Sequence, residues 1–114
     1  MRYLLLVYDN EDRVASLSES ALTAEVAEYQ DFGHEFGARI RSGDALQPTS
    51  MATTVSVRHG KRVIRDGASD DPGQQLGRYC LVEADDLDVA IGMAARIPGA
   101  RFGRVEVRPI RQFA

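Results

Sequence analysis

The 114-residue sequence predicts a single domain of the α+β class with ferredoxin-like topology, in which a βαβ unit, a hairpin and a second βαβ unit follow one another. Three observations predict this order. Two helical apolar patterns are each enclosed by strand-like runs, His59-Gly60 is a typical two-residue turn between two further strands, and no repeat or linker divides the chain.

The composition is that of an ordinary globular protein and excludes several classes of function. Hydrophobic residues make up 44% and charged residues 27% of the chain. The net charge of -3 argues against a nucleic-acid-binding protein. A single cysteine excludes an intrachain disulfide, and the apolar run Leu4–Val7 is too short for a signal sequence or a membrane span. We therefore expect a cytoplasmic protein without membrane contact.

The first βα segment extends from Tyr3 to about Ser42. Residues Tyr3–Tyr8 predict a strand that is apolar on both alternating faces, and the polar residues 9–16 predict a loop. Ser18 is a suitable N-cap for a helix that runs to about Ser42 and stops at Gly43. Its apolar face consists of Leu22, Val26, Tyr29, Phe36 and Ile40.

A hairpin follows a short strand at Ala45–Gln47. Its strands are Thr53–Arg58 and Lys61–Arg65, joined by His59-Gly60, where glycine tolerates a positive φ.

The two-residue turn sets the hairpin register. It pairs Val55 with Ile64, and Asp66 lies in phase with this apolar pair. We therefore expect Asp66 to leave the hairpin on its apolar side.

The second βαβ half is preceded by a polar loop, Gly67–Leu76. A strand at Gly77–Ala84 is again apolar on both faces, a helix begins at Asp85 or Asp86 and ends at Pro98-Gly99, and a last strand spans Val105–Ile110. The buried stripe of this helix is predicted at Leu87, Ala90, Ile91, Ala94 and Ile97.

Two helices can cover only one face of such a sheet. Because the strands at residues 3–8 and 77–84 are apolar on both faces, something else must cover the second face. A second copy of the chain is the economical solution, so we expect a homodimer packed sheet to sheet, as in a dimeric α/β barrel.

Four segments carry a family resemblance, at one spacing over nearly the whole chain. They are MRYLLLVY, ALQPTSMATTVSVRHGKRVIRDG, QQLGRYCLVEADDLDVAIGMAARIP and VEVRPI. The chain resembles the YCII-related family in its DGPF-type branch, and the resemblance implies the dimeric α/β barrel fold. It leaves the function open, because some relatives are small-molecule enzymes with a His-Asp pair, including a dehydrochlorinase, whereas the DGPF branch is associated with extracytoplasmic-function sigma factors.

The chain departs from the family in the loop that follows the hairpin. The family loop reads Asp-Gly-Pro-Phe and continues Ala-Glu-Thr-Lys-Glu, whereas this chain keeps Asp66-Gly67 and diverges over residues 68–73. A ligand role of the family's aromatic, threonine and lysine therefore does not carry over. The catalytic relatives place their histidine early in the first helix, and His34 lies later.

Asp66 and His34 are the candidate catalytic residues. A carboxylate at the rim of an apolar cleft can serve as a general base, although an Asp-Gly pair is also a common turn whose side chain caps nearby amides. His34 can pair with Asp31 on the same helix for acid–base chemistry, or lie solvated on the helix surface.

No cofactor or metal is predicted. The chain has no glycine-rich phosphate loop, and its two histidines and one cysteine lack a ligand spacing. The acidic group Asp66, Asp70 and Asp71 lacks the pattern of a calcium loop, and Cys80 is a small core residue.

Two functional hypotheses remain. In the first, a homodimer binds a small-molecule ligand in an apolar pocket and carries out lyase- or isomerase-type acid–base chemistry. In the second, the chain is a non-catalytic regulatory or sigma-factor-associated protein that binds a protein partner. The first would use aromatic side chains as pocket lining, and the candidates are Tyr8, Tyr29, Phe32, Phe36 and Tyr79. The second would use the basic hairpin residues Arg58, Lys61, Arg62 and Arg65, which also suit an edge hairpin that avoids aggregation.

Overall fold

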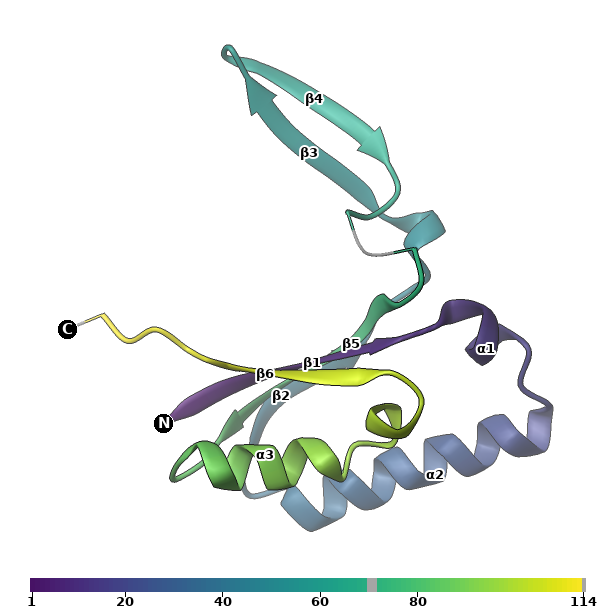
Figure 1. Ribbon diagram of the computed structural model, residues 1–114, viewed down its shortest axis with the longest axis vertical. Helices are drawn as coiled ribbons and strands as arrows, with labels where there is room; N and C mark the ends of the chain where they lie inside the picture. The colour runs from purple at the N-terminus through teal and green to yellow at the C-terminus, as the bar shows by residue number, and fades with distance from the viewer. Residues whose placement is uncertain (70–71, 114) are drawn as a thin grey trace.

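The computed structural model describes residues 1–69 and 72–113 and shows one sheet, a helical layer and a projecting hairpin (Figure 1). The strands are β1 (Arg2–Asp9), β2 (Ile40–Ala45), β3 (Thr53–Arg58), β4 (Lys61–Asp66), β5 (Gln75–Glu83) and β6 (Arg104–Pro109). The helices are α1 (Glu11–Ala15), α2 (Glu19–Phe36) and α3 (Leu87–Ala95), with short 3-10 turns at Thr49–Met51 and Pro98–Arg101.

The main sheet has the strand order β2-β5-β1-β6, and every neighbouring pair is antiparallel. Without the hairpin, this is the ferredoxin-like order, since each βαβ unit leaves room for a strand of the other half. The predicted α+β class and ferredoxin-like topology are therefore confirmed.

The core lies between one face of the sheet and the helices α2 and α3. The side chains of Tyr3, Leu5 and Val7 alternate along β1 and are almost fully buried on this face. They meet Val82 from β5 and Met93 from α3 in one cluster. Every second side chain of β1 and β5 therefore faces the helices and packs against them.

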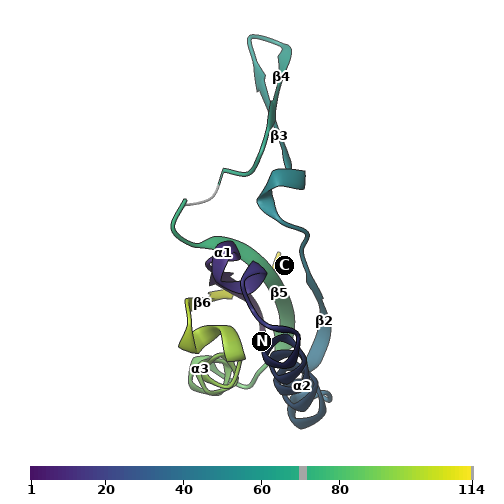
Figure 2. The same ribbon diagram turned by 90° about the vertical axis from the view of Figure 1, so that its right-hand side faces the viewer.

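The opposite face of the sheet is open. Leu4 and Leu6 are partly buried, and the β1–β5 register places them opposite Leu81 and Tyr79. Both views show α2 and α3 on the other side of the sheet (Figures 1 and 2). The chain by itself therefore leaves an apolar strip of the sheet uncovered.

The hairpin β3–β4 stands away from the body on the open side of the sheet (Figure 1). Its register is the predicted one, with Val55 opposite Ile64 and Arg58 opposite Lys61. His59 and Gly60 both have positive φ, at 53° and 75°, as a two-residue turn with the strand twist requires.

The apolar side chains of the hairpin are largely exposed within the described part of the chain. Val55, Val57 and Ile64 are 58%, 59% and 60% exposed. The radius of gyration is 16.0 Å, whereas a compact chain of this length has about 13 Å. We name residues 53–66 the hairpin arm.

Two predictions in the first half were wrong. Residues 9–16 do not form only a loop, because Asn10 caps α1 by accepting hydrogen bonds from Asp12 and Arg13. The first helix also ends at Phe36 rather than near Ser42.

The chain between residues 40 and 45 is strand β2, which shares only Ala45 with the predicted short strand at 45–47. Gly43 is no helix stop. It pairs with Cys80, and a Cβ at Gly43 would lie 2.9 Å from the Tyr79 carbonyl oxygen. Pairing with β5 overrides the helical spacing of Ile40, which lies opposite Val82.

The helical stripes were also partly mispredicted. Of the predicted second stripe, Ala90, Ala94 and Ile97 are buried, whereas Leu87 and Ile91 are both 49% exposed. Met93, which was not predicted, is buried in their place. On α2, Leu22 and Val26 are 45% and 48% exposed. Phe32 in the second half of α2 is buried, whereas the first half of the helix borders the cavity described below.

Leu5→Ala should lower the free energy of unfolding by about 2–5 kcal/mol, because it removes a fully buried side chain from the middle of the core. Urea denaturation followed by circular dichroism measures the change. Ile91→Ala is the matched control and should change it by less than about 0.5 kcal/mol, since Ile91 is a half-exposed surface residue. Equal effects of the two substitutions would contradict this assignment of the core.

Candidate functional site

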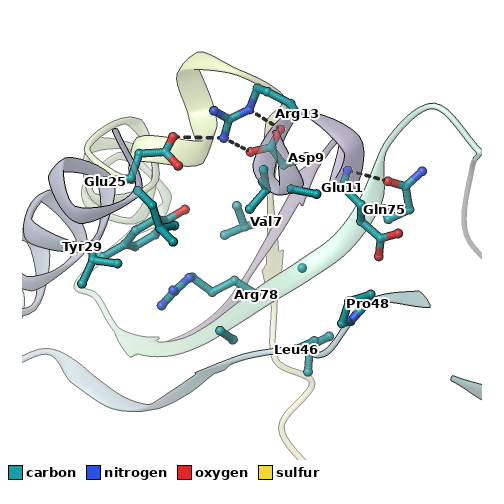
Figure 3. Close-up of a pocket in the computed structure, with 16 residues that line it drawn as sticks. Val7, Asp9, Glu11, Arg13, Glu25, Tyr29, Leu46, Pro48, Gln75 and Arg78 are labelled. Carbon is teal, nitrogen blue, oxygen red and sulfur yellow. Dashed lines mark hydrogen bonds and ion pairs between the residues drawn. The ribbon is translucent and has the colours of Figure 1, made fainter. Parts of the chain in front are cut away.

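A cavity of about 340 Å³ lies between α2, the α1 segment and the ends of β2 and β5 (Figure 3). Most of its wall is apolar. The apolar wall is formed by Val7, Val14, Leu22, Val26, Leu46 and Pro48. Polar groups enter it from two sides, which is the usual composition of a site for a small organic molecule.

The first polar group is an ion-pair network formed by Asp9, Arg13 and Glu25. The Arg13 guanidinium lies 2.6 Å from an Asp9 carboxylate oxygen and 3.0 Å from a Glu25 oxygen. The carboxylate side chains are only 15% exposed, so this is the least exposed ion-pair cluster among the described residues. The hydrogen bond to Asp9 raises the pKa of the Arg13 guanidinium.

Short helix α1 is held in place by its first residue. Glu11 accepts hydrogen bonds of 2.7 Å and 2.8 Å from the backbone N–H and the hydroxyl of Thr49. Its own N–H donates to the Gln75 side-chain oxygen at 2.9 Å. These contacts tie α1 to the chain after β2 and to the start of β5, and so close one end of the cavity.

The second polar group is the pair Arg78 and Tyr29. The Arg78 guanidinium carbon lies 3.9 Å from the centroid of the Tyr29 ring. Arg78 is opposite Val7 in the β1–β5 register, and therefore on the helix-covered face of the sheet. Burial raises the pKa of the Tyr29 hydroxyl despite the nearby Arg78 charge, so the phenol is protonated at neutral pH.

Gly99 allows this packing. A Cβ at residue 99 would lie 2.5 Å from a Val7 methyl carbon and 3.1 Å from the Tyr29 hydroxyl. The chain can therefore pass close behind the tyrosine only without a side chain here.

Neither predicted catalytic residue lines the cavity. Asp66 is exposed at the end of β4, at the root of the hairpin arm. His34 is exposed on α2 and forms no ion pair or hydrogen bond with Asp31 within the described chain. The acid–base assignments of Asp66 and His34 stay predictions.

Of the predicted aromatic lining, only Tyr29 borders the cavity. Phe32 is buried in the core and contacts Phe36, at a ring-centroid distance of 5.2 Å. Tyr79 points to the open face of the sheet, where its hydroxyl donates to Asp44 at 2.8 Å. This bond raises the pKa of the Tyr79 hydroxyl. The centroid of the Tyr8 ring lies 4.3 Å from the guanidinium carbon of Arg104.

Sequence reasoning missed the residues that α1 and β5 contribute. Asn10 before two acidic residues, Glu11 and Asp12, is a helix-start signal that could have revealed α1. Arg78 gives no such signal, because its inward direction follows only from the pairing of β5 with β1.

The described residues contain no group of three or more His, Cys, Asp or Glu side chains able to hold a metal ion. Asp70 and Asp71, from the predicted acidic group, lie outside the described residues. In the part of the chain that the structure describes, no helix is long and apolar enough to cross a membrane.

The family model of the YCII-related domain matches residues 1–114. The chain belongs to the YCII-related family. An uncharacterized protein of Rhizobium meliloti (strain 1021) is 28% identical over 119 residues, covering 96% of this chain and 92% of that protein.

A solved structure shows the same fold as this YCII-family protein. It is 5-chloro-2-hydroxyhydroquinone dehydrochlorinase from Burkholderia phenoliruptrix AC1100, in complex with 2,5-dihydroxybenzoquinone. The TM-score is 0.51 at 15% identity, and the match covers 99% of this chain and 96% of the dehydrochlorinase. The likeness confirms the α+β fold with an antiparallel sheet, of the dimeric α/β barrel type.

Cys80 should react slowly with iodoacetamide in the native protein at mildly alkaline pH. The thiol is buried, and burial raises its pKa, so little reactive thiolate forms. Mass spectrometry of the alkylated protein measures the rate, which should rise at least tenfold in guanidinium chloride. Ser20→Cys combined with Cys80→Ala places the thiol on the exposed α2 surface and should react fast without denaturant. Native alkylation as fast as that of this control would refute the core role of Cys80.

Proposed function

We propose that this YCII-family protein is a homodimer that binds a small organic molecule in the cavity between α2 and β5. On that molecule it performs acid–base chemistry of the lyase or isomerase type. The observation that carries the proposal is the cavity of about 340 Å³, whose apolar wall is interrupted by inward polar groups. The dehydrochlorinase of the same fold, solved with a dihydroxybenzoquinone, supports a ligand of this size.

The lining residues supply the parts that such chemistry needs. Elimination or isomerisation begins when a base removes a proton and a nearby cation or donor stabilises the resulting anion. Glu25 is the carboxylate base, because both Asp9 oxygens accept hydrogen bonds from Arg13. Arg78 is the cation and the Tyr29 hydroxyl is the proton donor.

We also place the chain in the DGPF-type branch of its family, with a divergent loop at residues 68–73. Asp66-Gly67 at the start of the loop and Gln75-Leu76-Gly77 at its end support this placement.

The homodimer is supported by two uncovered surfaces. The strip of Leu4, Leu6, Tyr79 and Leu81 is the open face of the main sheet, and a second sheet packed on it would remove it from water. The hairpin arm stands on that same side (Figure 1), so each arm would lie beside the body of the partner.

Charge favours the same assembly. The arm carries Arg58, Lys61, Arg62 and Arg65 against Asp66, a net charge of +3, so the rest of the chain carries -6 out of the total of -3. A two-stranded hairpin alone is marginally stable in water, and a partner of opposite charge would stabilise it.

The same arm supports the second candidate function, a regulatory or sigma-factor-associated interaction protein. Its exposed Val55, Val57 and Ile64 beside four basic residues suit an acidic protein partner. The two candidates differ in what covers the arm, which the oligomeric state decides.

Leu6→Lys should convert the dimer to a monomer, because it buries an unpaired ammonium at the centre of the sheet interface. Sedimentation velocity at micromolar concentration measures the mass. Leu87→Lys, a matched change on the outer surface of α3, should leave the dimer intact. A monomeric wild-type protein would reject the homodimer and favour the second candidate.

Val26→Trp should abolish binding of compounds that co-purify with the protein, because the indole fills the cavity. Mass spectrometry of the denatured protein's supernatant detects them. Ile91→Trp introduces the same ring on the exposed surface of α3 and should not affect binding. If both variants retain the co-purifying compounds equally, the compounds bind outside this cavity.

Asp66→Asn and His34→Asn test the predicted catalytic residues. If a partner subunit brings either residue to the ligand, its amide variant should lose at least about a hundredfold in turnover, the usual contribution of a general acid or base. Turnover found in a metabolite screen is the measurement, with Asp88→Asn on α3 as the control. Unchanged turnover would remove that residue from the mechanism.

A further inference from the structure

Arg78 is a cation without a countercharge. Among residues 1–69 and 72–113, its guanidinium has no ion-pair or hydrogen-bond partner, whereas Arg13, Arg96 and Arg101 each pair with a glutamate. It is half-buried and lines a mostly apolar cavity. A guanidinium that is partly withdrawn from water in this way is a receptor for an anion.

The Tyr29 ring holds this cation in place. The Arg78 guanidinium carbon lies 3.9 Å from the centroid of the Tyr29 ring, and no described residue accepts a hydrogen bond from the N–H edge of the guanidinium. That edge matches the two oxygens of a carboxylate. The site is therefore preorganised for a carboxylate, since the side chain is already held before the ligand enters.

The wall opposite Arg78 carries hydrogen-bond acceptors. Figure 3 shows Asp9, Arg13 and Glu25 together on one side of the cavity and Arg78 on the other. One Glu25 oxygen lies 3.0 Å from Arg13, and the other accepts no hydrogen bond from a described residue. This wall offers an acceptor to a hydroxyl group of the ligand.

We propose that the cavity takes a small hydroxylated aromatic acid, with its carboxylate on Arg78 and its hydroxyl on Glu25. The inference rests on the proposed function of the cavity. The volume of about 340 Å³ suits a single ring, since small-molecule pockets start at roughly 300 Å³. The aromatic ring of such a ligand lies between its carboxylate and its hydroxyl, just as the apolar wall of the cavity lies between Arg78 and Glu25.

The acidic wall does not prevent anion binding. Coulomb energy falls with distance, so a carboxylate in contact with Arg78 gains more than it loses to charges across the cavity. Arg13 already neutralises one of the two carboxylates there. Glu11 is occupied by Thr49.

The experiment compares 4-hydroxybenzoate, benzoate and 4-hydroxybenzyl alcohol by isothermal titration calorimetry on the full-length wild-type protein. The hydroxy acid should bind tightest. Arg78→Met should lower the affinity for 4-hydroxybenzoate by about tenfold to a hundredfold, as expected for the loss of a charged hydrogen bond. It should leave the affinity for the alcohol unchanged. Glu25→Gln should lower the affinity for 4-hydroxybenzoate more than the affinity for benzoate.

Arg104→Met is the matched control, because Arg104 stacks on Tyr8 at 4.3 Å but does not line the cavity. It should bind 4-hydroxybenzoate as the wild type does. Circular dichroism and thermal unfolding of each variant show that the fold is retained. Arg78→Lys should recover part of the affinity, because it restores the charge without the planar fork.

The outcomes separate the inference from the function on which it rests. If the alcohol binds as tightly as the acid, or if Arg78→Met keeps the affinity for the acid, the anion assignment is wrong while the small-molecule site stands. If none of the three compounds binds, the hydroxylated aromatic acid is rejected as the ligand class, and the comparison of Val26→Trp with Ile91→Trp then decides the proposed function of the cavity.

Discussion

The alternation of side chains along β1 is the constraint on which the rest of the structure depends. Tyr3, Leu5 and Val7 point to one face, and Leu4, Leu6 and Tyr8 point to the other. The helices α2 and α3 both lie on the first face (Figure 1). The first set of side chains therefore builds the core, while the second set is left for a surface that the chain alone does not complete.

The cavity arises because the core ends before the helical layer does. The second half of α2 packs on the sheet through Phe32 and Phe36, whereas the first half extends beyond the buried cluster. Short helix α1 and the chain after β2 enclose the space below it and bring charged side chains to its wall. In this space charged groups are partly removed from water, so pairing and hydrogen bonding decide their chemistry.

The hairpin arm and the open sheet face both expose apolar side chains to water. A projecting two-stranded ribbon with exposed valines and isoleucine gains little stability from its own contacts. A partner that covers the sheet would cover the arm as well, since both lie on the same side (Figure 1). In such an assembly the root of the arm, with Asp66, would stand close to the neighbouring subunit.

The sequence by itself determined the local patterns. These are the strand at residues 3–8, the hairpin with its register, the N-cap at Ser18, an acidic N-cap at residue 85 or 86, and the buried strand around Cys80 and Val82. These follow from alternation, capping and turn chemistry, which act between near neighbours. The tertiary structure decided that residues 40–45 are a strand, because pairing with β5 outweighs helical spacing. It also decided that Arg78 and Tyr29 meet and that Asp66 stands away from the cavity, because such contacts join segments far apart in the chain, and no local pattern encodes which of them meet.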